Sequence, residues 1–120
     1  MQDDKRKTVR IDRAICVTIQ RVADEPELRR TVDAVARDVS LNGIGLVADA
    51  PFDNETKVQV TVYFNFETEN GRFCSAEGVV RSCAPEADGK FRIGIVLGER
   101  PRRELQAWHD MLQRWRSFVS

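Results

Sequence analysis

Residues 57–66 have the sequence KVQVTVYFNF, in which apolar and polar side chains alternate. The apolar residues stand at every second position: Val58, Val60, Val62, Phe64 and Phe66. Successive side chains of a β-strand point to opposite faces of the sheet, so a period of two puts these residues on one face. The stretch therefore predicts a strand with an apolar face in the core.

Further stretches of the same kind lie on both sides of this strand. They cover residues 14–20, 31–39, 44–47, 73–83 and 91–97. Sequences rich in Gly, Asn, Asp and Pro separate them and are typical of turns. Short strands joined by such turns indicate an antiparallel barrel or sandwich. For a chain of 120 residues, one closed barrel is the more economical solution, because closure leaves no exposed sheet edge.

The pattern changes at Pro101, a residue that suits the first turn of a helix. Apolar residues then recur at spacings of three and four: Leu105, Trp108, Leu112, Trp115 and Val119. This spacing predicts an amphipathic helix over residues 102–118. The expected organisation is a flexible N-terminal arm over 1–13, a barrel over 14–98 and a C-terminal helical segment over 99–120.

Met111 and Phe118 add a second apolar line beside the main stripe of this helix. A helix that only caps its own barrel could carry polar residues there, and apolar patches rarely stay open on soluble monomers. One hypothesis is that this line contacts a partner protein or forms a homodimer with a second copy of the chain. The alternative is that both side chains fold back onto the barrel.

The composition is that of a globular protein, with 42% apolar and 32% charged residues. No apolar run approaches the roughly 20 residues that span a bilayer, so no membrane insertion is expected. The segment Met1–Arg10 is polar and lacks the apolar region of a secretory signal, which makes the cytoplasm the expected location. Cys16, Cys74 and Cys83 have no metal-ligand spacing, so we expect reduced thiols.

The net charge is zero but unevenly distributed. Residues 1–21 hold six Lys/Arg against three Asp, whereas residues 22–98 hold eight Lys/Arg against thirteen acids. Nucleic-acid binders usually carry a broad basic face, and single-strand binders expose aromatic residues beside basic ones. Here Phe64 and Phe66 share the parity of the core. We therefore expect no nucleic-acid polymer as a partner, although the basic arm can form a local anion site.

The residue patterns of enzymes are missing. His109 is the only histidine, and no Cys or carboxylate stands at metal-ligand spacing from it on the predicted helix, so we expect a surface or packing residue. Gly-rich phosphate loops, nucleophile elbows and paired carboxylates are absent from the sequence. The expectation is a protein that is not an enzyme and has no metal or cofactor.

Two short motifs stand out together. Residues 6–10, Arg-Lys-Thr-Val-Arg, form an RxxxR directly before the first predicted strand. Residues 38–43, Asp-Val-Ser-Leu-Asn-Gly, form a DxSxxG at a turn between two strands. In this order and spacing they resemble the signature of the PilZ domain family. Residues 39–46, 78–81 and 92–97 also resemble that family's strand pattern.

The resemblance implies a mainly β fold, a single six-stranded antiparallel barrel with a C-terminal helix, and the bacterial second messenger cyclic di-GMP as ligand. Arginine matches a phosphate or a guanine acceptor edge with paired hydrogen bonds, so Arg6 and Arg10 are the expected partners of those groups. Asp38 can accept hydrogen bonds from guanine N–H groups. Ser40 supplies a hydroxyl, and Gly43 permits close backbone approach or a positive φ.

Other residues are weaker candidates for the same site. The possible secondary contacts are Lys5, Arg13, Asn42 and Arg81. Lys5 stands where many family members have a further arginine, and a lysine cannot make the planar bidentate contact. Trp108 and Trp115 could stack on guanines, but their helical spacing favours a role as core anchors.

Each motif also has a structural interpretation. RxxxR arises easily by chance in a chain with 19 Lys/Arg, and DxSxxG can be a turn whose Asp and Ser bond their own backbone. Together they predict a non-enzymatic cyclic di-GMP receptor. Its arm would fold across the barrel on binding and change the surface offered to an unidentified effector protein. The alternative is a PilZ-like adaptor that binds protein partners but no nucleotide.

Overall fold

The computed structural model describes residues 9–10, 16–23, 30–64 and 72–119. Its strands are β1 (Val9–Arg10), β2 (Cys16–Arg21), β3 (Thr31–Ser40), β4 (Gly43–Ala48), β5 (Lys57–Phe64), β6 (Arg72–Pro85) and β7 (Phe91–Leu97). A short 3-10 helix, Ala87–Gly89, joins β6 to β7, and helix α1 (Arg102–Val119) follows the last strand. The turns predicted near 24–27 and 69–71 lie outside the described residues.

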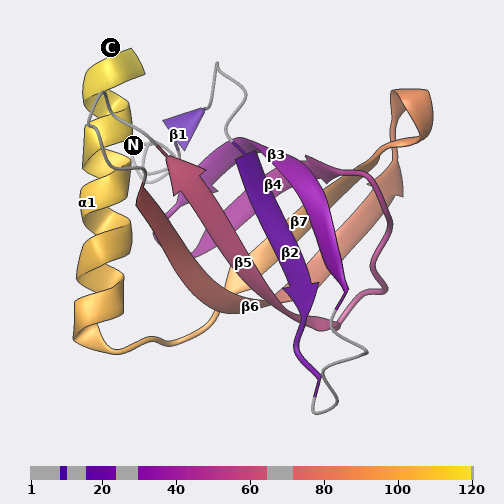
Figure 1. Cartoon of the computed structure of the whole chain (residues 1–120), viewed down its shortest axis with the longest axis horizontal. Coiled ribbons are helices and arrows are strands. Elements are labelled where there is room, and N and C mark those ends of the chain that lie inside the picture. Colours follow the sequence, from indigo (N-terminus) through magenta and orange to yellow (C-terminus); the bar gives the residue numbers. More distant parts are fainter. Residues whose placement is uncertain (1–8, 11–15, 24–29, 65–71, 120) are drawn as a thin grey trace, which may run out of the picture.

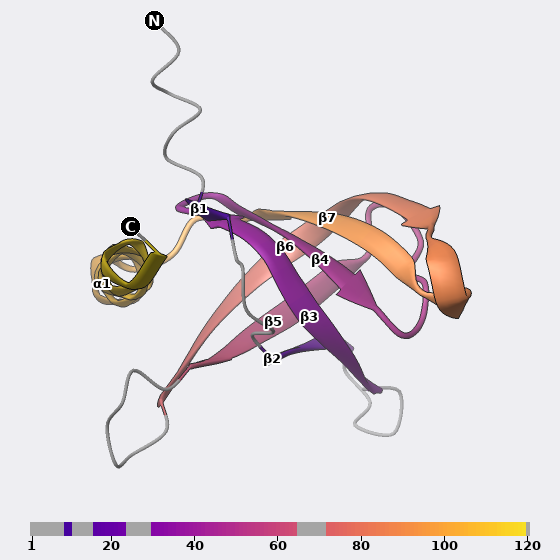
Figure 2. The same cartoon turned by 90° about the horizontal axis from the view of Figure 1, so that it is seen from above.

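Six of these strands close into an antiparallel barrel (Figures 1 and 2). The order around the barrel is β3-β2-β5-β6-β7-β4, and pairing between β4 and β3 closes it. Strand β1 is an addition that pairs with the second half of β3. The predicted fold class, a mainly β six-stranded antiparallel barrel with a C-terminal helix, is confirmed. The sequence did not predict β1 as a separate strand.

The core consists of the inward side chains that the period-two pattern predicted. On β5 the side chains of Val58, Val60 and Val62 are fully buried, and on β2 those of Val17 and Ile19 are buried as well. Removing such a side chain from water stabilises the fold by about 1.5 to 3 kcal/mol. The alternation in the sequence is therefore the direct cause of the barrel's inner and outer faces.

Two strands carry one extra residue relative to a neighbour. In β3 this residue is Arg37, and in β6 it is Arg81. Such a β-bulge shifts the alternation of inward and outward side chains by one position. On β3 the buried positions move from Ala36 to Val39, which leaves Asp38 on the outer face of the barrel.

Helix α1 stands at one side of the barrel and contacts β6 and β1 (Figures 1 and 2). Trp108, Met111 and Leu112 are buried in the same cluster as the strand core. Trp108 is 1% exposed, which confirms the prediction that it anchors the helix to the core.

Of the two interpretations of the second apolar line on α1, folding back onto the barrel is confirmed at Met111, and contact with a partner is wrong there. This side chain is also only 1% exposed and packs into the core of its own chain. The reason is geometric, because residues 108, 111 and 112 lie on adjacent turns of one helix face. The side chain of Phe118 lies outside the described part of the structure. A homodimer through this line therefore loses its basis.

Candidate ligand-binding site

The bulge in β3 puts Asp38 next to Gly45 on the outer face of the barrel. The two residues are Cα partners across the β3–β4 ladder. The carboxylate leans over the glycine so closely that a Cβ on Gly45 would lie 2.8 Å from Oδ1 of Asp38. A side chain at position 45 would displace the carboxylate. The sequence analysis did not identify Gly45 as a site residue, although it lies only two positions after Gly43.

Ser40 and Gly43 pair with each other at the end of the β3–β4 hairpin, and Asn42 is exposed in the turn between them. The Ser40 hydroxyl donates to the Gly43 carbonyl at 3.3 Å, as a structural turn would. A Cβ on Gly43 would lie 3.2 Å from the carbonyl oxygen of Ile95. Among the described glycines only Gly89 has a positive φ, so the alternative of a positive φ at Gly43 is wrong. A glycine fits at position 43 because the backbone of the neighbouring strand β7 lies close to it.

Strand β1 brings the RxxxR motif to the DxSxxG motif. The Cα atom of Arg10 is opposite that of Asp38. Strand β2 pairs with β3 over Thr31 to Val35, and β1 occupies a later stretch of the same edge. Two motifs that are far apart in the sequence therefore meet at one position of the sheet. The other basic candidates of the arm lie outside the described residues: Lys5, Arg6 and Arg13.

Asp38 begins a row of residues that crosses four strands on the outer face. The row consists of Asp38, Gly45, Gly94 and Ser82. A Cβ on Gly94 would lie 2.7 Å from Oγ of Ser82, so a polar side chain leans over each glycine. We call Gly45 and Gly94 the glycine strip. Sequence reasoning did not identify Gly94 or Ser82, which become neighbours of Asp38 only through strand pairing.

The absence of side chains at Gly45 and Gly94 makes room for the side chains of Asp38 and Ser82, which lean over the backbone there. A ligand at this face therefore meets these two polar side chains first. Asp38 at one end offers acceptors, and Ser82 at the other end offers a hydroxyl. Val96, in the next row across the sheet, is 45% exposed and adds apolar surface beside the strip.

Arginines on the outer face are held in exposed ion pairs. Arg81, one of the secondary candidates, pairs with Glu55 at 2.8 Å. Arg37 and Arg92 both face Oε2 of Glu86, at 3.7 and 3.3 Å. Exposed ion pairs contribute only about 0 to 1 kcal/mol, so an anionic ligand can compete for these guanidinium groups. Sequence reasoning did not identify Arg37, which directly precedes Asp38.

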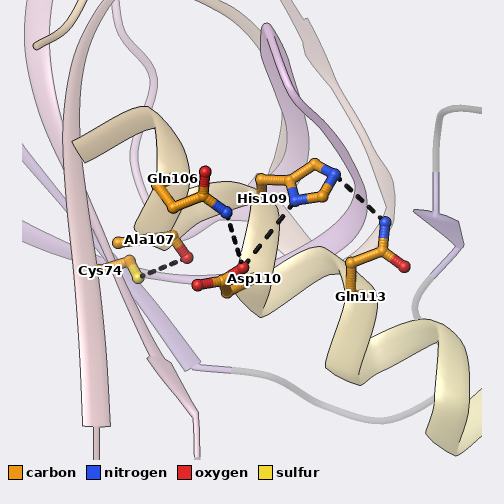
Figure 3. Close-up of polar contacts among 6 residues, drawn as sticks. All are labelled: Cys74, Gln106, Ala107, His109, Asp110 and Gln113. Carbon is orange, nitrogen blue, oxygen red and sulfur yellow. Dashed lines mark hydrogen bonds and ion pairs between the residues drawn. The ribbon is translucent and has the colours of Figure 1, made fainter. Parts of the chain in front are cut away.

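The polar groups on the outer side of α1 bond mainly to one another (Figure 3). His109 is half-exposed, with Nδ1 3.9 Å from Asp110 and Nε2 3.3 Å from Gln113, which confirms it as a surface residue. The thiol of Cys74 on β6 donates to the carbonyl of Ala107 at 3.8 Å. All three cysteines are free thiols, as expected.

Within the described ranges, no group of three or more His, Cys, Asp or Glu residues has a metal-binding arrangement. No described helix has the length and apolar character needed to cross a membrane. A surface hollow of about 480 Å³ lies at the start of α1, and the described residues that line it all belong to that helix. Asp38, in contrast, lies on the barrel's outer face.

The structure defines the class of protein as a small closed six-stranded antiparallel barrel with a C-terminal helix, in which the strand that carries Arg10 pairs with β3 beside the β3–β4 turn. The PilZ domain profile matches residues 4–112. The chain therefore belongs to the PilZ domain family, and the resemblance seen in its two motifs is confirmed.

Two solved structures share the fold. The PilZ domain with c-di-GMP of YcgR from Escherichia coli has a TM-score of 0.68 and 12% identity, covering 93% of this chain and 88% of that one. The Bacillus subtilis inhibitor of motility, MotI/DgrA, has a TM-score of 0.67 and 21% identity over 94% of this chain. This chain spans about half the length of the B. subtilis protein, of which 52% is covered. A search of curated proteins found no match.

Proposed function

We propose that this chain is a non-enzymatic cyclic di-GMP receptor that signals to a partner protein. The observation that carries the proposal is the register of β1 on β3, which sets Arg10 opposite Asp38. Cyclic di-GMP requires guanidinium donors and a carboxylate acceptor within reach of one ligand, and this pairing brings together the two motifs that supply them. Membership of the PilZ family supports the same ligand.

In the proposed complex, Arg6 and Arg10 bind a phosphate and a guanine acceptor edge with paired, charge-assisted hydrogen bonds. Asp38 accepts hydrogen bonds from guanine N–H groups. One guanine ring lies against Asp38 and Ser82, the side chains that cover the glycine strip, with Val96 beside it. Arg37 and Arg92 add positive charge near this face, where Glu86 balances only one of them.

The proposed response is a change in the N-terminal arm. Strand β1 consists of two residues, so it contributes few ladder hydrogen bonds by itself. Ligand contacts from Arg6 and Arg10 would then add substantially to the free energy that fixes the arm on the outer face. A partner protein would recognise the resulting surface. We place this receptor in the cytoplasm, where the messenger would be available to it.

Isothermal titration with cyclic di-GMP tests the proposal directly. We expect saturable binding, and weaker binding of cyclic di-AMP because adenine lacks the O6 acceptor and the N–H groups that Asp38 would bind. GTP serves as a control for unspecific attraction of phosphate to the basic arm. No detectable heat and no shift of the unfolding midpoint with cyclic di-GMP would contradict the proposal.

One observation favours the second candidate, an adaptor that binds protein but no nucleotide. The Ser40 hydroxyl is already bonded to the Gly43 carbonyl, so the turn holds its shape without a ligand. In this case the outer face would bind a partner directly. The same titration separates the candidates, since an adaptor binds its partner equally with and without cyclic di-GMP.

Asp38→Asn is expected to weaken cyclic di-GMP binding about tenfold or more, while the unfolding midpoint stays nearly unchanged. The amide keeps the shape of the side chain but removes the charge and replaces one acceptor with a donor. A lost hydrogen bond to a charged group costs about 1.5 to 3 kcal/mol. Titration and thermal unfolding measure the two effects. Unfolding of the variant would instead support the purely structural role of the turn.

Gly45→Ala is expected to reduce the affinity for cyclic di-GMP indirectly, by displacing the Asp38 carboxylate. The added Cβ would lie 2.8 Å from the carboxylate and force it aside, so we expect a loss of about tenfold in titration, from one displaced charged contact. Gly98→Ala is the matched control, because its Cβ would meet its nearest neighbour at 3.9 Å. Equal affinity of Gly45→Ala and wild type would show that Asp38 needs no particular position.

A further inference from the structure

Three consecutive carbonyls of the turn between β3 and β4 accept hydrogen bonds, two from side chains of the C-terminal segment and one from the last residue of β7. The acceptors are the carbonyls of Ser40, Leu41 and Asn42, and the donors in the same order are Trp108 Nε1 at 2.8 Å, Arg100 Nη2 at 2.6 Å and the Leu97 N–H at 2.9 Å. These carbonyls belong to the DxSxxG motif. The turn is thus fixed by side chains that follow the barrel as well as by its own hairpin.

Arg100 and Trp108 also contact each other. The guanidinium lies 5.6 Å from the centre of the indole ring, and its Nε donates to the Gly98 carbonyl at 3.2 Å. Burial lowers the pKa of Arg100, although nearby Glu104 acts to raise it. Within the described part of the chain, its buried Nη1 atom has no hydrogen-bond partner. Desolvating a charge in this way is unfavourable, which points to a role beyond stability.

Helix α1 also supports strand β1, the second element of the candidate site. It contacts β1, the strand that carries Arg10, and Figure 2 shows the two elements on the same side of the molecule. Trp108 and Met111 fix the helix in the core. A shift of α1 relative to the barrel would therefore disturb both the turn and β1.

We propose that Arg100 and Trp108 are positioning residues of the ligand site. Through their hydrogen bonds to the turn, the docking of α1 and the geometry of the turn depend on each other. The coupling between helix and turn follows from the contacts of the chain itself. Its consequence for cyclic di-GMP rests on the proposed function. Because coupling between two sites is reciprocal, a ligand that binds the fixed turn stabilises the docked helix.

Two variants remove the donors while keeping most of the packing. Trp108→Phe retains an aromatic ring but loses the indole N–H. Arg100→Met retains most of the aliphatic chain but loses the guanidinium. Arg103→Ala is the control, since Arg103 lies exposed on the same helix. If Trp108→Phe fails to fold, Arg100→Met provides the same comparison, because Arg100 remains partly exposed.

Titration and hydrogen exchange test the coupling. We expect each variant to bind cyclic di-GMP at least about fivefold more weakly, the lower end of typical coupling between sites, with no change for Arg103→Ala. In the wild type and the control, cyclic di-GMP should slow amide exchange in residues 102–112. In the variants this protection should be reduced. Variants that unfold at lower temperature but bind and protect α1 like the wild type would overturn the proposal.

Hydrogen exchange without ligand separates this proposal from the proposed function. Trp108→Phe should speed amide exchange in residues 38–45, and Arg103→Ala should not. If the wild type fails to bind cyclic di-GMP, the proposed function falls, while faster exchange in the turn still supports the coupling between helix and turn. Unchanged exchange in the turn would overturn that coupling, whatever the ligand does.

Discussion

Trp108→Ala is expected to lower the free energy of unfolding by about 3 to 5 kcal/mol, as for other buried tryptophans. The indole ring is 1% exposed and joins α1 to the barrel core. Its loss leaves a cavity, removes the hydrogen bond to the Ser40 carbonyl and weakens the packing of Met111. Small domains have a total stability of about 5 to 15 kcal/mol, so this variant should be marginally stable.

Urea unfolding followed by circular dichroism measures this effect. The control is Arg103→Ala, an exposed position on α1 where we expect a change within about 0.5 kcal/mol. A loss below about 1 kcal/mol for Trp108→Ala would mean that the barrel is stable without the docked helix. In that case α1 could not be an integral part of the core.

The Arg6→Ala, Arg10→Ala double variant is expected to weaken cyclic di-GMP binding by about 3 to 6 kcal/mol, or at least about a hundredfold. Each arginine would lose a charge-assisted contact that contributes about 1.5 to 3 kcal/mol. Arg10 is in a two-residue strand outside the closed barrel, so the unfolding midpoint of the free protein should change little.

The two single variants show whether the arginines act on one ligand. Losses that do not add in the double variant indicate a shared contact, because neighbouring sites couple whereas distant ones add. Arg102→Ala and Arg103→Ala remove the same amount of positive charge from α1 and serve as the control. If the control weakens binding as strongly, the attraction is one of overall charge and the RxxxR motif has no specific role.

Much of the fold follows from patterns that are local in the sequence. The alternation around Val58, Val60 and Val62 determines which face of β5 is buried, because side-chain direction along a strand depends only on residue parity. The helix after Pro101 likewise follows from its spacing of apolar residues. The DxSxxG motif correctly placed Asp38 and Ser40 at a turn between two strands. These features need no knowledge of the partner strands.

The outward position of Asp38 was decided by the tertiary structure. In a regular strand with Ala34 and Ala36 buried, a period of two would also turn Asp38 into the core. The extra residue Arg37 reverses this parity. A bulge exists only relative to a partner strand, so the sequence of β3 alone does not contain it. The sequence left the burial of Met111 open for a related reason, because the width of a helix's buried face depends on how closely the helix packs against its neighbours.

The sequence by itself determined the six barrel strands, the helix and the two motifs of this protein, because each depends on residues that are near one another in the chain. Only the tertiary structure placed Gly45 beneath the Asp38 carboxylate and the Cα atom of Arg10 opposite that of Asp38. The hydrogen bond between Trp108 and Ser40 joins residues 68 positions apart. Such contacts form when the barrel closes and the helix docks. Their energy comes from packing between segments that are distant in the sequence, and this packing leaves no periodic pattern in either segment.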